Sequence, residues 1–190
     1  MEIDHMNAII ASIRAEYLRY KALAEAAIAQ LSETELAMPG AGGGNSILTI
    51  CWHVAGNLRS RFTDFLTSDG EKPWRNRDEE FQPRAATRAE LLAHWEEGWA
   101  ALLDTLGGLT DADLARTVTI RGQPLRVHEA LHRSLAHASY HVGQVVYAAR
   151  GLRGEAWRFL SIPPGQSAQY NAQPAFEKPG AQEARLRQPG

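Results

Sequence analysis

Four of the seven histidines of the chain lie within one short segment. These residues are His128, His132, His137 and His141. In an α-helix each residue turns the chain by about 100°, so the first two share one face and the last two share a nearly opposite face. Each pair places two imidazoles one helical turn apart, the spacing by which the H-E-x-x-H helix of zinc proteases holds its metal. Either pair could bind a metal, but only one can serve a given site.

The residues around the two pairs narrow the chemistry without choosing between the pairs. No glutamate lies between His137 and His141, so the sequence lacks the general base of a zinc protease. The apolar stripe of this helix lies between the two pairs and leaves both at its borders. Small or polar residues that could leave a cavity accompany the second pair: Ala130, Ser134, Gln144 and Ala148. The first pair is accompanied by Ser139, Val146 and Arg150.

A third ligand would have to come from another element, and His53 is the natural candidate. Polar residues fall within about a quarter turn of it on a predicted helix, namely Asn57, Ser60, Arg61 and Asp64. The residues alone nevertheless favour a simpler interpretation, in which His53 lies on the solvated face of this helix. The apolar residues of the segment centre on the other side: Val54, Leu58, Phe62 and Phe65.

Cysteine usage limits the kind of metal site that is possible. Cys51 is the only cysteine, so the chain can form neither an internal disulfide nor a cysteine-rich zinc cluster, and any metal must rely on His, Asp or Glu. Cys51 is also turned about 200° from His53 on a helix, so we expect a small buried hydrophobic residue rather than a ligand. The glycine-rich run at 40–44 lacks the Lys-Ser/Thr of a phosphate-binding loop and is expected to be a flexible connector.

The charge balance and the N-terminal residues limit the kinds of partner that the chain can have. Lys and Arg total 20 against 22 Asp and Glu, so no net basic field is available for nucleic acid. Acidic residues occur near the N-terminus, and no apolar stretch approaches the roughly 18 residues needed to span a bilayer. We therefore expect a cytoplasmic protein that binds neither nucleic acid nor membrane.

Helical periodicity predicts four main helices, over residues 7–31, 46–67, 88–106 and 127–150. Ser46 can cap the second helix, and Thr87 with Glu90 forms a capping box before the third. A long polar connection over 68–86 should cross between them, and residues 118–120 read as a short extended piece. Similar segments at 31–36 and 109–114 suggest short helical turns. We predict an all-α four-helix bundle of up-down-down-up or similar topology over 1–171, with a mobile tail at 172–190.

Two segments carry a resemblance to a known group of proteins. They are residues 52–57 (WHVAGN) and residues 137–144 (HASYHVGQ), in which two histidines four apart are closely followed by Gly and Gln. On these residues the chain resembles the DinB-like (YfiT-like) superfamily of metal-dependent four-helix proteins. Residues 57–81 and 161–167 resemble a narrower bacterial branch of unknown function. The likeness extends from the first helix to about residue 171.

The resemblance implies a ligand set and a kind of reaction. It makes His53, His137 and His141 the metal ligands, and it leaves His5, His94, His128 and His132 without that role. It further implies a homodimer. Some members look like thiol-dependent S-transferases or isomerases that use low-molecular-weight thiols, whereas many have no known reaction.

Such a site has definite chemical consequences. Three neutral imidazoles leave a coordination position open, as in catalytic rather than structural zinc sites, and the cation favours a thiolate over a thiol. Zinc is our first expectation and nickel our second, since imidazole suits both. Asn57, Arg61 and Gln144 are candidates to bind an acidic cosubstrate. For Arg61 and for residues 75–77, surface ion pairing with neighbouring acidic residues is the simpler interpretation.

We therefore predict a metal-dependent transferase of the thiol S-transferase type that acts on a small molecule. The alternative, from another class, is a non-catalytic metal- or ligand-binding protein whose site stabilises the bundle or senses stress. The sequence offers no convincing general base, and no Ser-His-Asp arrangement can be picked out from spacing alone.

Overall fold

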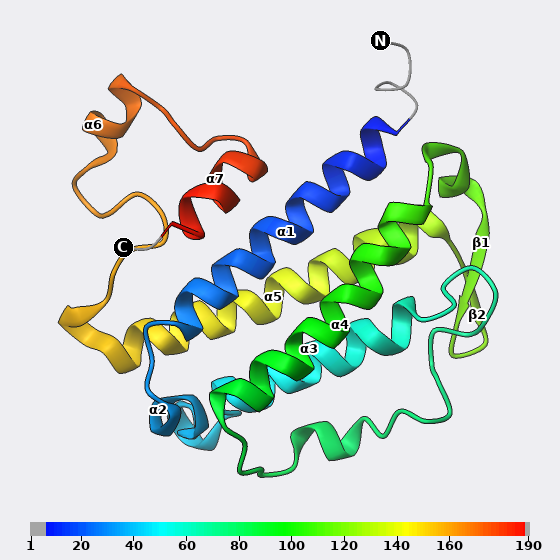
Figure 1. Ribbon diagram of the computed structural model, residues 1–190, viewed down its shortest axis with the longest axis horizontal. Helices are drawn as coiled ribbons and strands as arrows, with labels where there is room; N and C mark the ends of the chain where they lie inside the picture. The colour runs from blue at the N-terminus through cyan, green and yellow to red at the C-terminus, as the bar shows by residue number, and fades with distance from the viewer. Residues whose placement is uncertain (1–6, 189–190) are drawn as a thin grey trace.

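Four long helices make up most of the structure, a computed structural model that describes residues 7–188 (Figure 1). They are α1 (Ala8–Ile28), α3 (Ile47–Phe62), α4 (Arg88–Gly108) and α5 (Val127–Arg153). Helix α3 packs mainly on α4, α1 packs on α5, and α3 also contacts α5. Helices α1 and α5 run in one direction and α3 and α4 run in the other. The predominance of helix confirms the predicted all-α class.

Shorter elements connect these helices. They are α2 (Glu33–Ala37), η1 (Ala41–Gly43), η2 (Asp78–Phe81), η3 (Asp111–Ala115), β1 (Thr117–Ile120), β2 (Gln123–Arg126), η4 (Gly154–Ala156), α6 (Ser167–Ala172) and α7 (Pro179–Leu186). The short turns expected after the first and third helices are α2 and η3. The expected extended piece is β1, which pairs with β2 in an antiparallel hairpin that the sequence analysis did not predict. Its two turn residues, Arg121 and Gly122, both have positive φ, as a type I′ hairpin turn requires.

The predicted boundaries agree with the structure more closely at the starts of the four long helices than at their ends, and the largest difference is at the end of the second. The hydroxyl of Ser46 accepts a hydrogen bond from the backbone of Thr49, and the Thr87–Glu90 capping box is present. The second long helix was expected to reach residue 67, but α3 ends at Phe62. Asp64 takes a left-handed φ of 49°, which turns the chain so that Phe65 packs back against Phe62. Their three-residue spacing therefore imitates a continuing helix.

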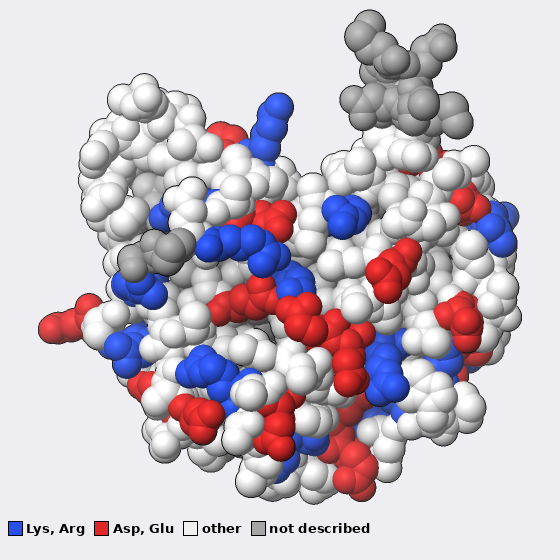
Figure 2. All heavy atoms as spheres, viewed as in Figure 1, with Lys and Arg blue, Asp and Glu red and all other residues white. Residues whose placement is uncertain are grey.

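The core lies along the inner faces of the long helices. Its largest fully buried side chains include Trp95, Trp99, Tyr17 and Phe62. The outer faces are polar, and Figure 2 shows basic and acidic side chains interspersed over the face that is viewed in Figure 1. Within residues 7–188, no helix has both the length and the hydrophobicity needed to cross a membrane.

Helices α3 and α4 approach so closely that one residue between them must be glycine. A Cβ on Gly98 would lie 2.4 Å from the carbonyl oxygen of Ala55 and 2.6 Å from its Cα. We expect Gly98→Ala to lower the free energy of unfolding by about 1–3 kcal/mol, because the two backbones must move apart. Gly107→Ala is the matched control in the same helix, where an added Cβ meets nothing within 4 Å. Urea unfolding should show the control to be neutral or slightly stabilised; equal effects would contradict the close approach.

The C-terminal part of the chain contains a helix that packs on the bundle. Helix α7 packs along α1, and Arg187 lies 3.7 Å from Glu25 on that helix. The side chain of Arg185 donates a hydrogen bond to the carbonyl oxygen of Leu160. The predicted mobility of residues 172–190 stays a prediction, although part of this segment forms α7.

Candidate metal centre

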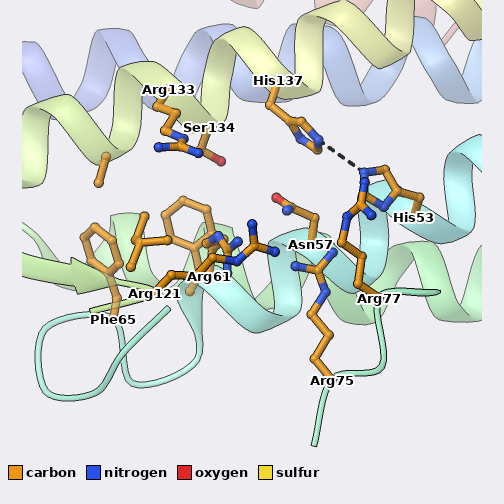
Figure 3. Close-up of a pocket in the computed structure, with 13 residues that line it drawn as sticks. His53, Asn57, Arg61, Phe65, Arg75, Arg77, Arg121, Arg133, Ser134 and His137 are labelled. Carbon is orange, nitrogen blue, oxygen red and sulfur yellow. Dashed lines mark hydrogen bonds between the residues drawn. The ribbon is translucent and has the colours of Figure 1, made fainter. Parts of the chain in front are cut away.

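Three histidines meet where α3 faces α5. His53 comes from α3, and His137 and His141 come from successive turns of α5. One ring nitrogen from each lies within 4.8 Å of the others. The Nε2 atoms of His53 and His137 are 3.2 Å apart, as the dashed line in Figure 3 marks. The packing of α3 against α5 therefore adds a third imidazole to the i, i+4 pair of His137 and His141.

The cluster fits a divalent metal by both distance and protonation. Two nitrogen ligands of a tetrahedral zinc, each about 2.0–2.1 Å from the metal, lie about 3.3 Å from one another, close to the separation of the two Nε2 atoms. Burial, assisted by the neighbouring histidines, lowers the pKa of His137 to about 3. Burial also lowers the pKa of His141. These two imidazoles are therefore neutral at pH 7 and offer lone pairs to a cation.

A buried carboxylate orients His53. Glu80, in η2, accepts a hydrogen bond of 2.8 Å from Nδ1 of His53 and two more from the guanidinium of Arg75. Burial alone would raise the pKa of Glu80, but the hydrogen bonds from His53 and Arg75 lower it overall. The ionised carboxylate holds the proton of His53 on Nδ1 and leaves Nε2 free to bind a metal.

The position of Glu80 depends on Gly56, which lies about one helical turn after His53 in α3. A Cβ on Gly56 would lie 2.3 Å from Oε1 of Glu80. Only a residue without a side chain lets the carboxylate lie against the helix at this point. Gly56 thus leaves room for the carboxylate of Glu80 to contact His53.

Gln144 orients a second histidine. Its Oε1 accepts a hydrogen bond of 2.7 Å from Nδ1 of His141, and its Nε2 donates one to the hydroxyl of Tyr140. Gln144 is not among the residues that line the cavity beside the cluster. The structure therefore places this candidate substrate-binding residue behind a histidine rather than in the substrate space.

A cavity of about 240 Å³ adjoins His53 and His137 (Figure 3). Asn57 and Arg61, the other two candidates for substrate binding, both line it. Four further arginines also contribute to its wall: Arg75, Arg77, Arg121 and Arg133. The cavity opens next to the histidine cluster, so a small molecule in it would lie beside His53 and His137.

The remaining described histidines lie elsewhere. Nδ1 of His128 lies 3.0 Å from the carbonyl oxygen of Leu114, and His132 is exposed on the same helix. His94 stacks on Trp52. His5 lies outside the described residues. The structure thus brings together the second histidine pair and His53, and it leaves the first pair out.

The structure bears on the sequence-based interpretations of His53, Cys51 and Arg75. The solvated position that the residues alone favoured for His53 is wrong, because this side chain is only 4% exposed. The expectation for Cys51 is confirmed, since it is fully buried and burial raises the pKa of its thiol to about 12. Arg75 does form an ion pair, but a buried one with Glu80 rather than one at the surface.

Sequence reasoning missed Glu80 as a partner of the site. It lies 27 residues after His53 in an irregular connection, so no helical spacing links the two. The one signal in the sequence was the glycine at position 56 within a helix, which is unfavourable there unless something approaches closely.

The fold and the site define a helical protein with a three-histidine cluster that could hold a metal ion, in which His53 is buried and His137 and His141 are half-buried. The family model described as "Protein of unknown function (DUF1572)" matches residues 4–166, and the chain belongs to this family. Comparisons with curated proteins and with solved structures gave no match.

Proposed function

We propose that His53, His137 and His141 bind one divalent metal, zinc first and nickel second, in a DinB-like metal-dependent transferase. The observation that carries the proposal is the meeting of three imidazoles from two helices, with two Nε2 atoms 3.2 Å apart, beside an open cavity. The two segments that resemble the DinB-like superfamily lie on α3 and α5, and their histidines are the ones that meet.

The reaction that this site suits best is transfer of a thiol sulfur to a small electrophile. A divalent metal held by three neutral imidazoles favours the thiolate form of a thiol and leaves a coordination position for it. The protein's own residues then divide the remaining tasks. Glu80 and Gln144 orient His53 and His141, while Asn57 and Arg61 face the space that the thiol cosubstrate would occupy.

A transfer assay tests this function. Protein loaded with zinc or nickel would be mixed with glutathione or cysteine and with 1-chloro-2,4-dinitrobenzene. The sulfur bonds to the ring carbon, chloride leaves and the thiol proton passes to solvent. We expect a rate above the uncatalysed reaction that requires the metal and is lost in His137→Ala. A metal-loaded protein that transfers none of the thiols tested would instead support the non-catalytic alternative.

A further inference from the structure

The cavity beside the three histidines is lined by positive charge from several elements. Arg61 comes from α3, Arg75 and Arg77 from the connection before η2, Arg121 from the hairpin turn and Arg133 from α5. No aspartate or glutamate is among its lining residues. Figure 3 shows Arg133 on the α5 side and the other four across the cavity from it. The whole chain has a formal net charge of −2, so this concentration is local.

The carboxylates that pair with these five arginines are too few to neutralise them, even though the buried Glu80 pairs with Arg75. Glu71 is shared, since its Oε2 lies 3.0 Å from Arg61 and 2.8 Å from Arg121, and its Oε1 lies 4.0 Å from Arg75. Arg77 lies 3.8 Å from Asp78, whose side chain is almost fully exposed. Such a solvated pair offsets little charge.

Two of the arginines have donors to spare. The side chain of Arg75 is only 2% exposed, yet its Nη1 makes no hydrogen bond to any described residue. A buried charged donor without a partner costs free energy that an anionic oxygen in the cavity would recover. Arg133 is exposed on α5 and takes part in none of the ion pairs formed within residues 7–188. A ligand could therefore be held from the buried wall and from the rim at once.

The hairpin explains how Arg121 reaches the site. The two carboxylate oxygens of Asp69 accept hydrogen bonds of 2.8 Å from the backbone N–H groups of Arg121 and Gly122. The backbone of Gly70 also donates a hydrogen bond of 2.8 Å to Thr119. The small sheet is thereby tied to the start of the crossing connection, and its turn is fixed at the cavity.

We propose that this cavity binds a small molecule that carries at least two negative charges, as carboxylate or phosphate groups, next to His53 and His137 of the histidine cluster. The proposal names the substrate class of the same site, so its catalytic meaning rests on the proposed function, whereas the binding itself does not require a metal. The volume of about 240 Å³ lies below the usual range of about 300–1,000 Å³ for drug-sized ligands, which points to a small metabolite.

Calorimetric titration of the full chain, with and without bound zinc, tests the inference. The probes are succinate and inorganic phosphate, and butanoate is the control that keeps the carbon chain of succinate but carries one charge. We expect each divalent anion to bind at least about ten times more tightly than butanoate, and more weakly as ionic strength rises. Succinate and phosphate distinguish carboxylate from phosphate recognition, and the tighter of the two names the preferred group.

Variants on one helix supply the matched comparison. Arg133→Gln should weaken succinate binding by about five-fold, the loss expected for one partly exposed charge. Arg150→Gln should leave it unchanged, since Arg150 is an exposed arginine of α5 that does not line this cavity. Equal affinity for succinate, phosphate and butanoate, or equal losses in the two variants, would overturn the proposal.

Metal content measured on the same samples separates this inference from the proposed function. Zinc bound without any preference for divalent anions would overturn the anion site and leave the metal centre standing. A preference for divalent anions in a protein that binds no zinc would overturn the metal centre and retain the anion site.

Discussion

His137→Ala removes the bound metal, whereas His132→Ala leaves about one zinc or nickel ion per chain. The expected difference is large because an open three-histidine site has no spare ligand, and a site with two imidazoles binds far more weakly. The two residues are the same amino acid on the same helix, but only His137 belongs to the cluster. Elemental analysis of tag-free protein after reconstitution measures the result.

A second measurement shows whether the metal acts on the folded state. At a metal concentration one hundred times its dissociation constant, binding stabilises the native protein by about 2.7 kcal/mol. Wild type and His132→Ala should show this gain in thermal unfolding, and His137→Ala should not. Equal metal content in both variants, or none in reconstituted wild type, would refute the ligand assignment.

Glu80→Gln lowers the affinity for the metal by about 10- to 100-fold, the usual effect of losing a carboxylate that orients a ligating histidine. Glutamine can still accept the hydrogen bond from Nδ1 of His53, but it lacks the negative charge that increases the basicity of that imidazole. The change is read from a competition titration against a chelator of known affinity. Glu79→Gln is the neighbouring control, since Glu79 is exposed.

If Glu80 positions His53, then moving its carboxylate should weaken metal binding. If Glu80 is only structural, moving it should change stability alone. Gly56→Ala keeps Glu80 but adds a methyl group that would lie 2.3 Å from Oε1 of Glu80, so the carboxylate must move. It should weaken metal binding in the same direction as Glu80→Gln. If both variants bind metal as wild type does while unfolding more easily, Glu80 is a buried ion-pair partner of Arg75 and nothing more.

The crossing connection between α3 and α4 therefore contributes more to the site than its composition indicates. It carries Glu80, which orients His53, together with Arg75 and Arg77, which line the cavity. Glu71 in the same segment links arginines from α3 and from the hairpin turn. The buried contacts between Arg75, Glu80 and His53 anchor this irregular segment to α3 and so help to hold these groups in place.

Local sequence was sufficient wherever the relevant contacts are one or two helical turns long. The periodicity of apolar residues, the caps at Ser46 and Thr87, and the i, i+4 spacing of His137 and His141 depend on helix geometry alone. The same reasoning went wrong at the end of α3, where Phe65 continues the apolar spacing after the helix has ended. It also could not find β2, whose pairing depends on a partner strand rather than on its own residues.

The sequence by itself determined the helical class, excluded an internal disulfide and a cysteine-rich zinc cluster, and showed two histidine pairs that could each bind a metal. Periodicity left the choice between the pairs open. The tertiary structure supplies the partner, because the packing of α3 against α5 brings His53 to His137 and His141, the set that the resemblance implied. It also places Glu80 against His53 and the five arginines around the cavity. These contacts join residues that are far apart in the chain, and no local spacing encodes a distance that is set by how helices and loops pack.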